Sequence, residues 1–274
     1  MPDAFLPLRP LLLLACLALP FCAQAAGKCE SLVATGSPDD PPYLWRDPAH
    51  PERLIGAEAD LLERIGKAIG VEIRVLYAGS RLHAEDEARS GRFDLFSGAF
   101  LTTDRLERMD YVHPAFLAAG SSIWVRKDAA FPTTRPEDLI GRKGVALTSQ
   151  NLGPGFDAFS RQLTLERVPS LAQAFQQLLL GRSDYLIHPY YPALAALDTL
   201  GMLNDVQVLE PPVASDGLYL ALAHDSACNT PWLRGQLAKK MTELTAAGVP
   251  QRLLEDNLAR WKAQQLQPGG IPTQ

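Results

Sequence analysis

The sequence predicts an α/β protein of two lobes, each a mostly parallel sheet with flanking helices. Short apolar stretches typical of strands alternate with amphipathic stretches typical of helices, and this alternation favours a parallel sheet covered by helices. The alternation pauses at Lys127 to Arg135, near two prolines, and then begins again. The 274 residues, 47% hydrophobic and 21% charged, suffice for two separate cores.

In the first part of the chain, strands and helices are expected in strict alternation. The predicted strands are 32–35, 71–77, 93–97 and 121–126, and the predicted helices are 57–69 and 82–90. The helix at 57–69 carries the clearest signal, because Leu61, Leu62 and Ile65 share one face and Gly70 ends it. A turn of small residues is expected at Ser97-Gly98-Ala99.

The second part of the chain repeats this pattern. The predicted strands are 143–147, a segment around 168, 184–188, 206–209 and 218–223, and the helices are 156 onward, 170–180, 193–200, 231–247 and 250–262. Gly91-Arg92-Phe93-Asp94 and Gly181-Arg182-Ser183-Asp184 each close a helix and open a strand. This short internal echo fits two lobes of similar design, and the strand at 218–223 is expected to return to the first lobe.

The N-terminus has the features of an export signal. Arg9 precedes an apolar run, and Ala23-Gln24-Ala25 forms a small-x-small cleavage site. The run is too short to span a bilayer comfortably, although a retained anchor and lipidation at Cys16 are alternatives. We therefore expect a signal peptide at 1–25.

Charge and cysteine usage narrow the function classes. Cleavage after Ala25 leaves Cys29 and Cys228, and two thiols in an oxidising compartment suggest one disulfide. The five histidines are scattered, so the sequence supports neither a metal site nor a cofactor. A net charge of −5 without a basic patch argues against nucleic acid as a partner.

The segment from Gly91 to Phe116 contains a candidate receptor for a carboxylate. Its small-residue turn leaves backbone N–H groups open, Thr102 and Thr103 begin a helix, and Arg105 adds a planar fork of donors. In the alternative interpretation, a threonine merely caps a surface helix and Arg105 pairs with Asp104 or Glu107.

Several landmarks occur in a recognisable order along the chain. They are Pro41-Pro42-Tyr43, Leu-x-Gly-x-x-x-Asp-Leu-Leu at 54–62, Gly91-Arg92-Phe93-Asp94, Thr102-x-x-Arg105, Asp110-Tyr111-x-x-Pro114-x-Phe116, Gly181-Arg182-x-Asp184 and Gly248 to Trp261. From Leu32 to Trp261 the chain thereby resembles the family-3 extracellular solute-binding proteins, the polar amino-acid type of periplasmic binding protein. Ala57 departs from the pattern, because the family usually has an aromatic residue there.

The resemblance implies a type II periplasmic binding protein fold, in which two crossing strands form a hinge and the lobes close on a small ligand. The expected divisions are 26–120 for the first part of lobe 1, 121–216 for lobe 2 with hinge strands, 217–264 for the return to lobe 1 with the C-terminal helices, and 265–274 for a disordered tail. It also implies a monomer in the periplasm that works with the membrane subunits of an ABC transporter.

The resemblance assigns ligand contacts residue by residue. Arg105, with Thr102 of its motif, would hold a ligand carboxylate, and backbone groups of Ser97, Gly98 and Ala99 would bind beside it. The first loop, with Asp40 and Tyr43, would cover the ligand. A helix start in lobe 2, at Ser149 and Gln150, would face the carboxylate.

Two departures from the family pattern bear on the ligand. Phe100 stands where amino-acid binders have Thr or Ser, and His188-Pro189-Tyr190 lacks the Asp that pairs with the ligand ammonium. A buried ammonium without a carboxylate costs several kcal/mol. We therefore predict a carboxylate ligand without an amine, surrounded by Phe100, Tyr43, Trp45 and Tyr190, with core packing as the alternative for each aromatic.

The predicted function is that of a periplasmic solute-binding protein that presents a small carboxylate-bearing ligand to an ABC transporter. A ligand sensor acting through a partner is the second hypothesis. An exported dehydratase-like enzyme is the third, with His188 and Glu58 as its acid–base candidates. We expect no catalysis, because neither candidate has a visible partner in the sequence.

Overall fold

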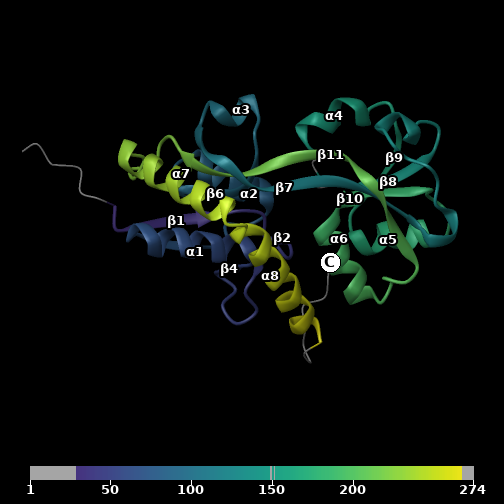
Figure 1. Cartoon of the computed structure of the whole chain (residues 1–274), viewed down its shortest axis with the longest axis horizontal. Helices are drawn as coiled ribbons and strands as arrows, with labels where there is room; N and C mark the ends of the chain where they lie inside the picture. Colours follow the sequence, from purple (N-terminus) through teal and green to yellow (C-terminus); the bar gives the residue numbers. More distant parts are fainter. Residues whose placement is uncertain (1–28, 149, 151, 267–274) are drawn as a thin grey trace, which may run out of the picture.

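Two strands of 18 residues each, β7 (Met109–Arg126) and β11 (Val206–Ala223), run between two lobes in the computed structural model (Figure 1). The structure describes residues 29–148, 150 and 152–266. One eight-stranded sheet, in the order β5-β1-β6-β11-β7-β10-β8-β9, continues through both lobes. The predicted two-lobed α/β class and its two hinge crossings are confirmed.

Lobe 1 contains the strands of one half of this sheet and a second sheet of three strands. Its strands are β1 (Ser31–Thr35), β2 (Asp39–Asp40), β3 (Leu44–Arg46), β4 (Leu54–Ile55), β5 (Glu72–Val75) and β6 (Leu95–Phe100). Its helices are α1 (Ala57–Ile69), α2 (Arg81–Arg89), α3 (Thr103–Leu106), α7 (Pro231–Ala246) and α8 (Val249–Gln265). Strands β5, β1 and β6 are parallel, whereas β11 joins β6 in antiparallel orientation.

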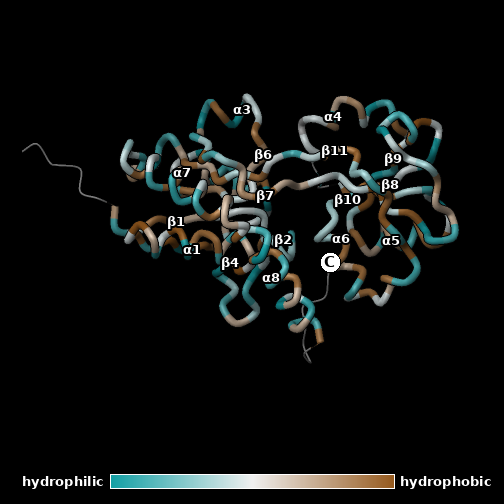
Figure 2. The backbone as a smooth tube through the Cα atoms, viewed as in Figure 1, coloured by the Kyte–Doolittle hydropathy of each residue, from teal (hydrophilic) through white to brown (hydrophobic). Residues whose placement is uncertain are grey.

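Lobe 2 contains the strands of the other half of the large sheet. Its strands are β8 (Lys143–Leu147), β9 (Thr164–Val168) and β10 (Tyr185–Pro189), and its helices are α4 (Pro154–Ser160), α5 (Leu171–Leu179) and α6 (Tyr190–Leu200), with 3-10 turns at Lys127–Ala129 and Pro136–Leu139. Adjacent residues point to opposite faces, so Ile123 and Trp124 enter different cores. Both faces are therefore buried, and Figure 2 shows apolar segments along α1 in lobe 1 and α5 in lobe 2.

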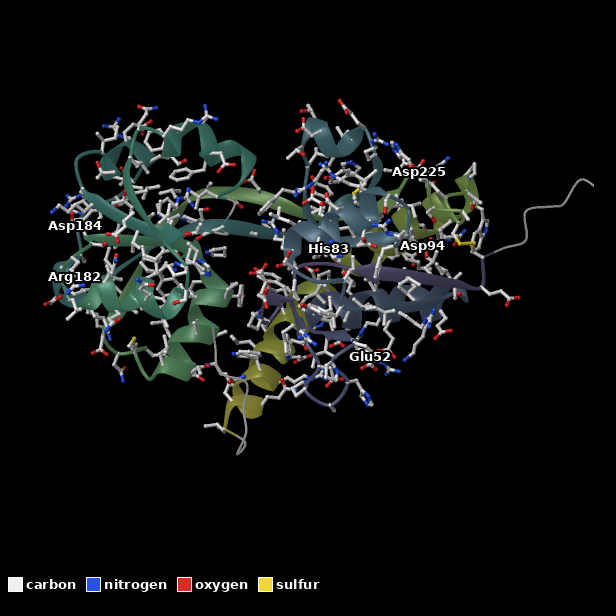
Figure 3. All side chains as sticks on the ribbon, turned by 180° about the vertical axis from the view of Figure 1, so that it is seen from behind. Glu52, His83, Asp94, Arg182, Asp184 and Asp225 are labelled. Carbon is white, nitrogen blue, oxygen red and sulfur yellow. A yellow bond between two sulfur atoms is a disulfide. The ribbon has the colours of Figure 1, made fainter. Side chains whose placement is uncertain are left out.

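The internal echo has a structural counterpart in Asp94 of lobe 1 and Asp184 of lobe 2, both labelled in Figure 3. Asp94 Oδ2 accepts a hydrogen bond of 2.8 Å from the backbone N–H of Val33, and Asp184 Oδ2 accepts one of 2.8 Å from that of Lys143. In each lobe the aspartate follows a helix and ties the next strand to an earlier strand. The repeated motif thus has the same structural role twice.

Several segments differ from their predictions, among them β7, which begins at Met109 and not at Ser121. The strands expected at 206–209 and 218–223 form one strand, because β7 pairs with both parts and the pairing shifts register between Leu209 and Ala214, around prolines that cannot donate ladder hydrogen bonds. The expected turn at 97–99 lies inside β6, where Gly98 has φ +76° and the pairing with β11 shifts register. Helix α6 begins at Tyr190, three residues before its predicted start.

The predicted disulfide is confirmed. Cys29 and Cys228 are bonded, with their Cα atoms 5.7 Å apart, and they lie 199 positions apart in the sequence. The bond fixes the entry to β1 against the loop that precedes α7, within lobe 1. The predicted signal peptide and its alternatives lie outside the described residues, and in the described part no helix is both long and apolar enough to cross a membrane.

Helix α8 makes a second connection between the lobes, beside the hinge strands (Figure 1). Lys262 Nζ lies 3.3 Å from Asp198 Oδ1 of α6, and Gln251 Nε2 donates to the hydroxyl of Tyr191 at 2.6 Å. Ala195 of α6 is buried in a cluster with Trp45 and Trp261. These contacts hold α6 of lobe 2 against α8 and β3 of lobe 1.

Candidate functional site

Arg105 lies in the short helix α3, directly after β6. The hydroxyl of Thr102 caps this helix by accepting a hydrogen bond of 3.4 Å from the backbone N–H of Arg105. The predicted helix start is therefore confirmed. The Arg105 side chain, however, turns into the protein, and the residue is only 6% exposed.

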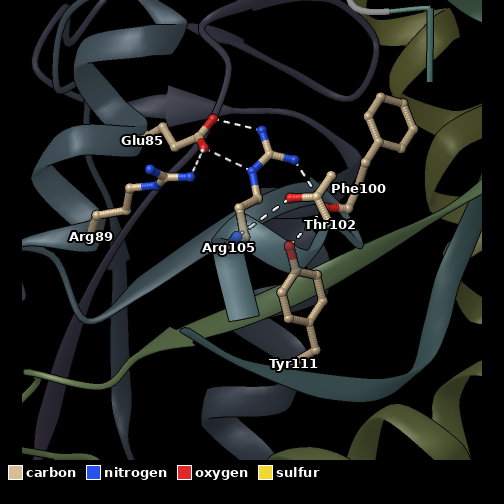
Figure 4. A network of polar contacts seen from close by, with 6 residues as sticks. All are labelled: Glu85, Arg89, Phe100, Thr102, Arg105 and Tyr111. Atoms are coloured by element: carbon tan, nitrogen blue, oxygen red, sulfur yellow. Dashed lines mark hydrogen bonds and ion pairs between the residues drawn. The ribbon is translucent and has the colours of Figure 1, made fainter. Parts of the chain in front are cut away.

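The guanidinium of Arg105 binds a carboxylate of the chain itself, that of Glu85 in α2 (Figure 4). Arg105 Nε donates to Glu85 Oε1 at 2.7 Å, and Nη2 donates to Oε2 at 2.6 Å. Nη1 donates to the backbone oxygen of Phe100 at 2.9 Å, which also accepts from the Tyr111 hydroxyl at 2.7 Å. The partner of Arg105 is thus neither Asp104 nor Glu107.

Glu85 pairs with two arginines, Arg105 and Arg89. Burial disfavours the charged form of Glu85, but the hydrogen bonds and charge of Arg105, with Arg89 at 3.3 Å, lower the pKa of Glu85 below its ordinary value. The sequence prediction did not include Glu85. A signal was present, because Ala84 and Ala88 mark the inward face of α2 and Glu85 lies next to that face, but helical spacing does not identify its partner.

The residues Ser97 to Phe100 form the end of β6. Strand β1 pairs with β6 only as far as Phe96, so Ser97 to Phe100 extend beyond its last partner on that edge. Ser97 and Ala99 are buried, and the half-buried Phe100 packs against the core of lobe 1. The resemblance assigns ligand contacts to the backbone of this segment, which belongs to a strand and not to a turn.

Glu58, in the first turn of α1, faces Ser97 and Gly98. A Cβ atom on Gly98 would lie 2.8 Å from Glu58 Oε1, so glycine makes room for the carboxyl. Glu58 is 3% exposed and none of the ion pairs among the described residues involves it. Burial raises the pKa of Glu58 to about 8, opposed by a hydrogen bond from Ser97 and assisted by the charge of Asp40.

Tyr43 and Asp40 adjoin Glu58 in the first loop. Tyr43 N–H donates to Asp40 O at 2.8 Å, and Glu58 N–H donates to Tyr43 O at 3.1 Å. Burial, and then the charges of Glu58 and Asp40, raise the pKa of the Tyr43 hydroxyl. Two acidic residues, Asp40 of the loop and Glu58 of α1, therefore lie close to the buried ring of Tyr43.

Aromatic rings link this loop to lobe 2. The Tyr43 and Tyr191 rings meet edge to face with centroids 6.5 Å apart, Tyr191 meets Tyr190 at 5.2 Å, and Tyr190 stacks on Trp124 at 5.7 Å. Trp45 behaves differently. Its ring packs on Trp261 at 5.5 Å and its indole nitrogen donates to Gln264, so Trp45 belongs to a buried cluster.

In lobe 2 the structure brings Gln150 and His188 together. Nδ1 of His188 lies 3.1 Å from Oε1 of Gln150, and the backbone oxygen of His188 accepts from Trp124 Nε1 at 3.1 Å. Burial lowers the pKa of His188 to about 3, so its imidazole is neutral near pH 7. The predicted contact at Ser149 lies outside the described residues.

The helix start expected at Ser149 and Gln150 lies later in the chain, because α4 begins at Pro154 after Gly153, and this start contacts a carboxylate of the chain itself. Asp216 of β11 accepts a hydrogen bond from the backbone N–H of Gly155. A Cβ atom on Gly153 would lie 2.0 Å from Asp216 Oδ2, so the carboxylate is in close contact with this turn. Burial raises the pKa of Asp216, while the hydrogen bond from Gly155 opposes the rise.

Comparison with known structures supports the fold. An amino acid ABC transporter substrate-binding protein from Streptococcus pneumoniae, bound to L-arginine, is 20% identical, with a TM-score of 0.64 over 85% of this chain and 96% of that one. A histidine kinase sensor domain similar to periplasmic binding proteins is 21% identical, with a TM-score of 0.64 over 85% and 96%. No curated protein sequence matches the chain.

A reconstructed ancestral protein is also similar in structure. It is an amino acid-binding protein described as a precursor of cyclohexadienyl dehydratase, 21% identical, with a TM-score of 0.63 over 84% of this chain and 95% of that one. At sequence level, the family model for bacterial extracellular solute-binding proteins of family 3 matches residues 32–259. The chain therefore belongs to the bacterial extracellular solute-binding proteins of family 3.

Proposed function

We propose that this protein binds a small solute between its two lobes in the periplasm and presents it to the membrane subunits of an ABC importer. The main support is a contact between aromatic rings of the two lobes. The ring centroids of Tyr43 in lobe 1 and Tyr191 in lobe 2 lie 6.5 Å apart. Family membership and the two hinge strands agree with this function. Export through a cleaved signal peptide at 1–25 is part of the proposal.

The sequence favours a carboxylate-bearing ligand held by Arg105, and this remains one hypothesis for the ligand. A carboxylate at the Nε–Nη2 edge of Arg105 would have to displace Glu85, which binds both nitrogens. Displacement would leave a buried carboxylate with Arg89 as its remaining ion-pair partner. The ligand must therefore compete with a partner that is already in place.

A sensor role is the second candidate, favoured by the structural similarity to a histidine kinase sensor domain. The catalytic hypothesis has less support. Glu58 and His188 lie in different lobes, and His188 is a neutral imidazole bound to Gln150. We propose that the chain binds its ligand without converting it.

A thermal-shift screen of solutes tests the binding function directly. A ligand at 100 times its Kd adds about 2.7 kcal/mol to the stability of the folded state. We expect at least one of a panel of carboxylates, amino acids, amines and sugars to raise the melting temperature. The same solute should then be taken up more slowly by cells that lack this protein. A panel without any stabilising solute would contradict the proposal, and turnover of a prephenate-like substrate would favour the enzyme.

A further inference from the structure

We infer that the ligand is a small organic amine without a carboxylate, because the chain provides its own carboxylates to Arg105, the side chain expected to receive one, and to the observed start of α4. This inference rests on the proposed function and names the ligand class of that same site. Glu85 binds Arg105 in lobe 1, and Asp216 binds the start of α4 in lobe 2. The amine would be received by Glu58, with Asp40, Tyr43 and Tyr191 around it.

In lobe 1 the guanidinium is neutralised in a fixed geometry. Both carboxylate oxygens of Glu85 accept hydrogen bonds, and the residues of the pair are 6% and 9% exposed. A third hydrogen bond, from Arg105 Nη1 to the backbone oxygen of Phe100, further fixes the orientation of the guanidinium. Parallel bidentate hydrogen bonds are the strong form of an arginine–carboxylate contact, so a ligand carboxylate would gain little by exchanging with Glu85.

In lobe 2 Asp216 lies at the observed start of α4. Its carboxylate accepts from Gly155 N–H and lies so close to Gly153 that any side chain there would collide with it. Gly153 has φ +94°, a conformation that favours glycine, so the close approach is built into the backbone. A second negative charge at this turn would be repelled by Asp216.

The remaining polar groups of the site suit a cation. Glu58 is 3% exposed, hydrogen-bonds to Ser97 and has no cationic partner in the described part of the chain. An ammonium group beside it would favour the charged form of this buried carboxyl and donate hydrogen bonds to it. Tyr43 and Tyr191 add aromatic rings, whose faces attract cations.

Ligand pairs that differ only in a carboxylate test this inference. We would titrate the mature chain by calorimetry with agmatine against L-arginine and cadaverine against L-lysine. At least one amine should bind tenfold or more tightly than its amino acid. Tighter binding of the amino acids would overturn the inference and leave the proposed function intact. Binding by neither pair, while another solute of the screen binds, would do the same, whereas a screen without any ligand would overturn the function itself.

Substitutions in α1 connect the result to Glu58. Glu58→Gln should weaken amine binding at least tenfold, because an amide of similar shape cannot ionise to pair with the ammonium group. Glu63→Gln, on the exposed face of the same helix, is the matched control and should bind as the wild type does. If Glu58→Gln fails to fold, Asp40→Asn takes its place and should weaken amine binding measurably. Unchanged amine affinity in the folded variant would overturn the inference.

Discussion

Lobe 1 and lobe 2 each hold an internal carboxylate, Glu85 on Arg105 and Asp216 at the start of α4, but the two carboxylates are bound with different strength. Glu85 makes two hydrogen bonds to a buried guanidinium, and two charges are paired away from water. Asp216, in a partly exposed part of β11, accepts a backbone hydrogen bond at the start of α4. Breaking the first contact strands a buried charge, whereas breaking the second exchanges one hydrogen bond for another with water.

The difference shows that an arginine in the expected position does not by itself indicate an anion site. The charge that reaches a ligand depends on what the arginine already binds. In lobe 1 the pairing cancels the positive charge of Arg105, and the buried acid Glu58 lies nearby at the Ser97–Gly98 segment. The predictions below break each part of this comparison, from the largest expected effect to the smallest.

Arg105→Leu should destabilise the protein by about 3–5 kcal/mol, because it leaves Glu85 buried without its main partner. Urea unfolding monitored by circular dichroism measures the loss. The double variant Glu85→Leu/Arg105→Leu should recover most of it. Arg92→Leu, which breaks the exposed Arg92–Glu87 pair at the end of α2, is the control and should cost far less than Arg105→Leu. Equal losses in both single variants would show that the Arg105 pair is an ordinary surface contact.

Glu58→Gln should stabilise the protein near pH 8 by about 1–3 kcal/mol and change its pH dependence. Burial raises the pKa of Glu58 to about 8, so the folded state holds a proton that the unfolded state releases near its ordinary pKa. The stability contribution of Glu58 is therefore fully present below the unfolded pKa and is lost as the pH rises toward 8. Melting temperatures measured from pH 5 to pH 8 should fall less in Glu58→Gln than in the wild type. Parallel curves would contradict the buried acid.

Asp216→Asn should have the smallest effect, about 1 kcal/mol or less, because the amide oxygen can still accept from Gly155 N–H. Chemical denaturation measures the change in the free energy of unfolding, with Asp157→Asn as a neighbouring control. A loss as large as that of Arg105→Leu would remove the difference between the lobes.

Sequence patterns predicted the elements whose signals are local. The bounds of α1 and β8 agree with the predictions 57–69 and 143–147, because an apolar face with a terminal glycine and a short apolar run are each complete within their own segment. The continuous strand β11 was predicted as two separate strands, because only the partner β7 shows that pairing resumes after the prolines.

The candidate site was predictable in part. Order and spacing located Arg105 and its Thr102 cap, and the compartment suggested the Cys29–Cys228 bond. The contacts of Arg105 with Glu85 and of Asp216 with Gly155 depend on tertiary packing. They join residues separated by 20 and by 61 positions on different elements, and no local pattern encodes such a meeting.

Calorimetric binding of L-arginine and agmatine to Glu85→Gln and to the wild type tests the central claim, that an internal carboxylate keeps a ligand carboxylate from Arg105. The neutral amide of Glu85→Gln cannot pair its charge with the guanidinium, which frees Arg105 for an anion. We predict that L-arginine gains at least tenfold in affinity in this variant, while agmatine changes less than twofold. Wild-type protein that already binds L-arginine as tightly as the variant, and loses that binding in Arg105→Leu, would contradict the account.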